Sequence, residues 1–229
     1  MSVKVLAFDT FGTVTDWHSG VSGTLNDLFS DLDGADLARR WRGTYAPIMA
    51  EVESGERPWT LLDDLQRETL NKLLRNEFGV TASSDQLDRA VHSWHLIPGW
   101  PDAADGIRRL KTKFVVCALS NGNVALLTEM AKNAGLEWDF VGGSDLWGHY
   151  KPSPATYLGL ADLMQVDPRE VMMVATHATD LEAARSNGLR TAYIDRPDEF
   201  GTGDKPNGAS DLDDFHATGL DDLADRLGC

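Results

Sequence analysis

Cysteine is scarce in this chain, which has two among 229 residues. Cys117 lies in the apolar run FVVCALS and is expected to be a small core residue, whereas Cys229 is the last residue. A disulfide framework needs several paired cysteines, and a thiolate metal site needs closely spaced ones. The sequence therefore predicts neither. No set of His, Asp or Glu residues has convincing metal-ligand spacing either, so we expect no metal and no cofactor.

Long apolar runs and an excess of basic charge are also missing. No run approaches the roughly 20 apolar residues of a membrane-spanning helix, and the first residues enter a strand pattern without a basic leader. The formal net charge of -15 opposes binding to nucleic acids and to anionic membrane surfaces. We therefore expect a cytoplasmic protein that acts on a small molecule. An anionic substrate would need local positive charge to overcome this field.

The chain does contain the composition of an ordinary globular protein, with 42% apolar and 25% charged residues. Its length allows one large domain, or a core with a smaller insert. Apolar runs predict five core strands, at Val3–Phe8, Phe114–Leu119, Phe140–Gly142, Val171–Ala175 and Thr191–Ile194. Helical patterns separate the last four strands, at Ala125–Ala134, Pro154–Met164 and Asp180–Asn187. This alternation predicts right-handed βαβ units, hence an α/β fold with a Rossmann-like parallel sheet.

A different region lies between the first strand and the rest of the sheet. Residues 15–97 have helical patterns only, over Asp36–Glu53, Pro58–Phe78 and Asp85–Trp94. An all-helical insert at this point would lie over the carboxyl end of the first strand, as a cap does. We therefore divide the chain into a core domain, residues 1–14 and 98–229, and a helical cap domain, residues 15–97.

Both ends of the core have further local signals. The stretch PGWPD, at Pro98–Asp102, is the expected return hinge from the cap. The segment GTGDKPNGASD, residues 201–211, is expected to be a surface loop. A last strand is expected near Phe215, followed by a short helix over Gly219–Leu227.

Polar residues follow four of the predicted strands. They are Asp9, Ser120 with Asn121, Lys151, and His177 with Asp180. Each has an ordinary explanation on its own, since Asp9, Ser120 or Asp180 could cap a helix and Lys151 could be a solvated surface residue. Open α/β sheets bind ligands at the carboxyl ends of their strands. The set as a whole therefore predicts an active site.

These segments resemble the haloacid dehalogenase superfamily over nearly the whole chain, through the sequences FDTFGT, ALSNG, YKP and ATHATD. The resemblance is to its (S)-2-haloacid dehalogenase branch, in which an Asp nucleophile works beneath a cap arginine. The Trp41-Arg42 pair matches that arginine, and this context favours Arg42 over its neighbours Arg39 and Arg40. Tyr157 follows Lys151 by six residues, as in that branch.

The resemblance implies covalent catalysis in two steps. Asp9 would displace halide from carbon, and water would then cleave the aspartyl ester. Asp180 would position or activate that water, and Lys151 would keep Asp9 ionised. Four residues are expected to hold Asp9 or the substrate carboxylate: Thr10, Thr13, Ser120 and Thr176. Tyr157 would orient Lys151 or Asp180, and Arg42 and Asn121 would bind the halide. The residues expected to line the pocket are Phe11, Trp59 and His177. Relatives of this kind are often dimeric, so a homodimer is an open expectation.

Position 11 is the main discriminator between reactions. Phosphatases of the same superfamily use Asp-x-Asp, in which the second Asp is a general acid, and carboxylates that bind magnesium. Here Phe11 replaces that acid, and a halide needs no protonation because it leaves as a stable anion. We therefore expect a hydrolase of short 2-haloalkanoic acids that uses no metal. The alternatives are a small-molecule phosphatase and a binding protein that has kept the fold without the activity.

The fourth motif departs from the pattern most common in the family. It often reads Ser-Asn-x-x-Asp, but this chain has Thr176-His177-Ala178-Thr179-Asp180. His177 adds a group that titrates near neutral pH. Our hypothesis is that it supplies an extra donor and reduces the pocket volume, which favours small haloacetates, fluorinated ones among them.

Overall fold

The strands form one parallel sheet. The computed structural model describes residues 2–203 and 208–229, and its strand order is β3-β2-β1-β4-β5-β6. The predicted strands are confirmed, with ends shifted by no more than two residues. Their bounds are β1 Val5–Phe8, β2 Val115–Leu119, β3 Phe140–Gly142, β4 Val171–Ala175, β5 Arg190–Ile194 and β6 Phe215–Ala217. The fold class is thus the predicted one, and β1 lies at the centre between β2 and β4.

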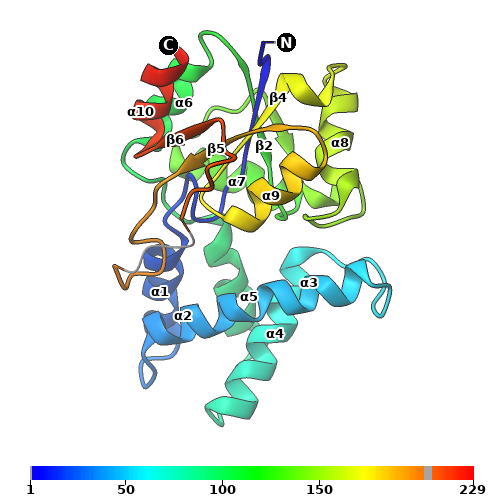
Figure 1. The fold of residues 1–229 in the computed structure, drawn as a ribbon. Coiled ribbons are helices and arrows are strands. Elements are labelled where there is room, and N and C mark those ends of the chain that lie inside the picture. The colour runs from blue at the N-terminus through cyan, green and yellow to red at the C-terminus, as the bar shows by residue number, and fades with distance from the viewer. Residues whose placement is uncertain (1, 204–207) are drawn as a thin grey trace.

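Helices cover both faces of the sheet because alternate strand residues point to opposite sides. Leu6 and Phe8 of β1 belong to one core cluster, and Val5 and Ala7 belong to another. Helices α6 (Ala103–Leu110) and α10 (Leu220–Leu227) pack in the first cluster, and α8 (Pro154–Leu163) and α9 (Ala178–Ser186) in the second. Figure 1 shows these pairs on either side of the strands. Cys117 is fully buried in the second cluster, as expected.

The region predicted as a cap, residues 15–97, is built from helices joined by short loops. It consists of α1 Trp17–Leu28, α2 Gly34–Gly43, α3 Tyr45–Glu53, α4 Leu62–Glu77, α5 Ser84–His92 and the 3-10 turn Ser93–His95. These helices lie beyond the carboxyl end of β1 (Figure 1) and share a third apolar cluster. Helix α7 (Val124–Ala134) of the sheet region contributes Leu126, Leu127 and Met130 to that cluster. The apolar side chains of α7 therefore join the two parts of the molecule.

One long predicted helix is two helices. The periodicity over Asp36–Glu53 predicted a single element, but α2 ends at Gly43 and α3 begins at Tyr45. Pro47 explains the break, because it has no N–H to donate to the carbonyl four residues earlier, that of Gly43. The Thr44 hydroxyl donates to the carbonyl oxygen of Trp41 at 2.7 Å and closes the end of α2. This break aims Arg42 and Tyr45 toward the sheet, since both line the cavity described below.

Paired backbone segments connect the helical region to the sheet. Thr15 and Gly99 form an antiparallel bridge, and the N–H of Asp16 donates to the carbonyl of Pro98 at 2.9 Å. The predicted return hinge at Pro98–Asp102 is thus one side of a short two-stranded connection. The loop predicted over residues 201–211 lies partly outside the described residues, which omit 204–207. Among the helices of the described residues, none is long and apolar enough to cross a membrane.

Candidate active site

Asp9 is the residue around which the site is built. It directly follows β1, its side chain is 9% exposed, and its two carboxylate oxygens have different partners. Lys151 Nζ donates to Oδ1 at 3.0 Å, whereas Thr13 Oγ1 donates to Oδ2 at 3.0 Å. Burial raises the pKa of Asp9, but the Lys151 charge and a hydrogen bond from His177 outweigh burial and hold it well below its usual range. Asp9 is therefore ionised at neutral pH and ready to act as a nucleophile.

Lys151 lies between two carboxylates. Its ammonium is 3.0 Å from Asp9 Oδ1 and 2.5 Å from Asp180 Oδ2. Burial lowers the pKa of Lys151, but the two negative charges raise it above its ordinary value. Asn121 fixes the backbone of Lys151, since its Oδ1 accepts from the Lys151 N–H at 2.6 Å and its Nδ2 donates to the Lys151 carbonyl at 3.3 Å. The side-chain amide of Asn121 is thus engaged with Lys151, although it also lines the cavity.

Asp180 occupies the first turn of α9 and is buried beside Lys151. The Tyr157 hydroxyl, from α8, donates to its Oδ1 at 2.7 Å. Burial raises the pKa of Asp180 above its ordinary value, with the Lys151 ammonium opposing the shift. A carboxylate with a raised pKa accepts a proton more readily, so Asp180 is suited to general-base work.

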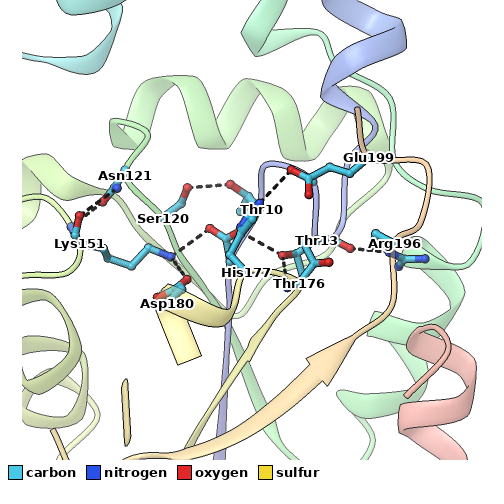
Figure 2. Close-up of polar contacts among 12 residues, drawn as sticks. Thr10, Thr13, Ser120, Asn121, Lys151, Thr176, His177, Asp180, Arg196 and Glu199 are labelled. Atoms are coloured by element: carbon cyan, nitrogen blue, oxygen red, sulfur yellow. Dashed lines mark hydrogen bonds and ion pairs between the residues drawn. The ribbon is translucent and has the colours of Figure 1, made fainter. Parts of the chain in front are cut away.

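His177 precedes α9 and contacts Asp9 from the side opposite Lys151. Its Nδ1 is 3.2 Å from Asp9 Oδ2, and its Nε2 is 2.9 Å from Oε1 of Glu199 (Figure 2). Burial lowers the pKa of His177, but the hydrogen bonds to the two carboxylates raise it to about 9. Glu199 is fully buried and was not predicted from the sequence. Its only sequence signal is an acidic residue in a loop that follows a core strand.

The remaining motif residues form a polar support around Asp9. The Thr176 N–H donates to Thr13 Oγ1 at 3.0 Å, and this aims the Thr13 hydroxyl proton at Asp9. The hydroxyls of Thr10 and Ser120 share a hydrogen bond of 2.7 Å. Thr10, Thr13, Ser120 and Thr176 are buried and do not line the cavity, and their hydrogen bonds support Asp9 and its loop.

A cavity of about 440 Å³ opens above Asp9, between the sheet and the helical region. It is lined by Asp9, Asn121, Lys151, Tyr157, His177 and Asp180 from one side, by Arg39, Arg42, Tyr45 and Met49 from the other, and by Phe200. Arg42 was the predicted cap arginine, and its guanidinium stacks 3.9 Å over the ring of Tyr45. In the described part of the chain, no carboxylate lies within ion-pair distance of Arg42. Arg40 faces elsewhere, in ion pairs with Asp36 and Glu77. Two arginines thus supply the local positive charge that an anionic substrate needs.

Two residues expected in the pocket wall lie elsewhere. Phe11 is 1% exposed and packs edge-on against Trp94 and Tyr45, so it supports the cavity wall from behind. Trp59 packs against Tyr150, with ring centroids 4.9 Å apart and ring planes tilted by 35°, and is 36% exposed. Neither lines the cavity. Tyr45 and Met49 form the apolar wall in their place, because the break at Thr44 turns the start of α3 toward the sheet.

The site thus has an ionised carboxylate at the end of the central strand of a parallel sheet, ion-paired with a lysine beneath helices that carry arginine. The chain belongs to the haloacid dehalogenase-like hydrolase family, whose model matches residues 3–188. Glu199 lies beyond the matched residues.

Several characterised proteins are similar over most of their length. The chain is 29% identical to (S)-2-haloacid dehalogenase 4A of Burkholderia cepacia over 199 residues, which is 85% of this chain and 84% of that one. The structure of the L-2-haloacid dehalogenase PA0810 is 41% identical, with a TM-score of 0.93 over 99% of this chain and 100% of that one. The defluorinating L-2-haloacid dehalogenase Rha0230 is also 41% identical, with a TM-score of 0.92 over 99% and 96%.

The contacts of His177 predict its titration. In protein labelled with ¹⁵N-histidine, we expect one imidazole to carry protons on both nitrogens at pH 7.5 and to titrate near pH 9, because it lies between two carboxylates. His177→Asn identifies the signal by its loss. A His177 signal that titrates near the ordinary value of about 6.5 would contradict this electrostatic account.

Proposed function

We propose that this chain hydrolyses the carbon–halogen bond of short 2-haloalkanoic acids through an ester at Asp9. The observation that carries the proposal is that Asp9 and Arg42 line opposite sides of the same cavity. Asp9 is ionised, and Arg42 has no carboxylate partner among the described residues. A haloacid fits this pair because the carbon attacked by Asp9 bears both a leaving halide and a neighbouring carboxylate. The similarity to 2-haloacid dehalogenases supports the same reaction.

In the first step, Asp9 Oδ1 is the better nucleophile of the two oxygens. It has one donor, Lys151, whereas Oδ2 faces two, Thr13 and His177. Attack by Oδ1 forms a carbon–oxygen bond while the carbon–halogen bond breaks, and the electron pair leaves with the halide. Arg42 and Arg39 stabilise the halide and the substrate carboxylate, since cations so placed favour the charge that develops as the halide departs.

In the second step, water adds to the ester carbon of Asp9, and Oδ2 takes the negative charge. Asp180 takes the proton of the water. Collapse breaks the bond between that carbon and Oδ1, which leaves as the oxygen of the 2-hydroxy acid. Lys151, already 3.0 Å from Oδ1, donates the proton that this alkoxide needs and is reprotonated by Asp180 at 2.5 Å. The net reaction consumes water and releases halide, a proton and the hydroxy acid.

The division of the chain belongs to the same proposal. We assign residues 15–97 to a cap that closes on substrate and residues 1–14 and 98–229 to the core. With this division, the polypeptide passes between core and cap twice, and the two passages are the paired segments at Thr15 and Gly99. We further propose that haloacetates, fluoroacetate included, are among the substrates, because the His177 ring occupies part of the cavity wall. The expected homodimer and cytoplasmic location stay predictions.

Halide release tests the proposed reaction. We expect the protein to release fluoride, chloride or bromide from the corresponding haloacetates, with rates that do not change when a chelator is added. Asp9→Asn should abolish release because the amide is not a nucleophile, whereas Asp162→Asn, on the exposed face of α8, should be unaffected. Magnesium-dependent turnover of an aryl phosphate without halide release would favour the phosphatase alternative. No turnover of either substrate would favour the binding protein.

Arginine substitutions test the cap side of the cavity. Arg42→Ala should lower kcat/KM for chloroacetate by about 10- to 100-fold, the cost of losing charged hydrogen bonds to the substrate. Arg40→Ala removes an arginine from the same helix that pairs outside the cavity, and we expect little change. Equal effects of the two substitutions would remove Arg42 from its proposed role.

A further inference from the structure

Glu199 has no role in the reaction as described above, yet its contacts lead to the nucleophile. Its Oε1 is 2.9 Å from His177 Nε2 and also accepts from Trp17 Nε1 at 3.1 Å. Gly12 makes room for it: this residue has a φ of +86°, and a Cβ there would lie 2.3 Å from Oε1. A fully buried carboxylate is costly without a charged partner. In the described residues, His177 is the only cationic side chain in hydrogen-bond contact with Glu199.

The geometry determines which protons His177 carries. An ionised carboxylate accepts hydrogen bonds and cannot donate them. His177 has such a group on each side. Asp9 contacts Nδ1, and Glu199 contacts Nε2 (Figure 2). Both nitrogens must therefore be donors, which requires the imidazolium form. Without Glu199, a neutral His177 ring could donate a hydrogen bond to Asp9 through Nδ1–H and would not need a proton on Nε2.

The charged ring lies where the second step needs it. Asp9 Oδ2 becomes the carbonyl oxygen of the ester, and it takes the negative charge when water adds. His177 Nδ1 at 3.2 Å and Thr13 Oγ1 at 3.0 Å both point at this atom. Donors aimed at an oxygen that gains charge stabilise the tetrahedral intermediate, and a charged donor does so more strongly than a neutral one. Alkylation, in contrast, removes negative charge from Asp9, so the imidazolium gives that step no such advantage.

We infer that Glu199 is a positioning residue for ester hydrolysis: it holds His177 as an imidazolium that stabilises the charge on Asp9 Oδ2. This inference rests on the proposed function and adds the means by which its second step is accelerated. Several other charged groups face the same space, and they are Lys151, Asp180, Arg39 and Arg42. The charge of Asp180 is opposite to that of these cations. Among the described residues, only Glu199 and Asp9 contact the imidazole nitrogens of His177.

Glu199→Gln tests this role because Gln keeps the size and can still contact Trp17. With chloroacetate, we expect a burst of about one chloride per active site, followed by turnover that is roughly 10- to 100-fold slower than in the wild type. Intact-protein mass spectrometry should then find the ester on Asp9 accumulated in the variant and not in the wild type. Glu129→Gln removes another carboxylate that contacts histidines, at 2.9 Å and away from the cavity, and should behave as the wild type.

The pH dependence of ester hydrolysis distinguishes a positioning role of Glu199 from a role in packing alone. Ester hydrolysis in Glu199→Gln should lose rate at a lower pH than in the wild type, by roughly one unit or more, since the imidazolium has lost one of its two carboxylates. A packing defect would lower the rate evenly at all pH values. In a His177→Asn background, Glu199→Gln should slow hydrolysis little further, because its effect passes through His177.

The outcomes distinguish this inference from the proposed function. If the wild type releases halide but Glu199→Gln shows no burst, no accumulated ester and an unshifted profile, the role of Glu199 is wrong and the reaction stands. If the wild type releases no halide, the proposed function fails first. If Glu199→Gln does not fold, the wild type still tests the inference. Its rate of ester hydrolysis must fall as the pH rises through the pH at which the ¹⁵N signal of His177 titrates. A rate that does not change over that pH range would overturn the inference.

Discussion

The ion pair of Lys151 with Asp9 and Asp180 is the interaction on which the site depends. Two buried carboxylates share one ammonium, at 3.0 and 2.5 Å, so the three side chains fix one another in position. Removal of one partner from a buried pair typically costs about 3–5 kcal/mol, because a charge is left uncompensated. The same contacts keep Asp9 ionised and leave Asp180 with a raised pKa. Stability and chemistry therefore rest on the same three residues, drawn from three separate segments that the parallel sheet brings together.

On the other side of Asp9, Glu199 contacts His177, and His177 in turn contacts Asp9. The two halves of the site thus hold different oxygens of Asp9. In the proposed reaction, Lys151 contacts the oxygen that attacks and later leaves, and His177 contacts the oxygen that takes negative charge during hydrolysis. This division assigns a separate cation to each step of the proposed reaction. Arg39 and Arg42 add positive charge to the cavity of a protein of net charge -15, and in the proposed reaction they bind the substrate anion.

The sheet and the polar residues at its carboxyl edge could be predicted because both are local in sequence. Apolar runs mark the strands, and Asp9, Lys151 and Asp180 each follow one of them in the sequence. Glu199 could not be found in this way, since its function comes from a loop that packs back against Gly12 and Trp17. Phe11 was misplaced for a similar reason. A residue two positions from the nucleophile was expected to face the substrate, but tertiary packing against Trp94 holds it behind the wall.

In the proposed mechanism, Asp9 attacks carbon, and water then attacks Asp9 and not the substrate. A single turnover in H₂¹⁸O, with enzyme in excess over chloroacetate, tests it most directly. We expect ¹⁸O to enter the carboxylate of Asp9, where peptide mass spectrometry locates it, and the product glycolate to carry unlabelled oxygen in its hydroxyl group. Label in that hydroxyl group, with Asp9 unlabelled, would mean that water displaces the halide directly and would contradict the covalent mechanism.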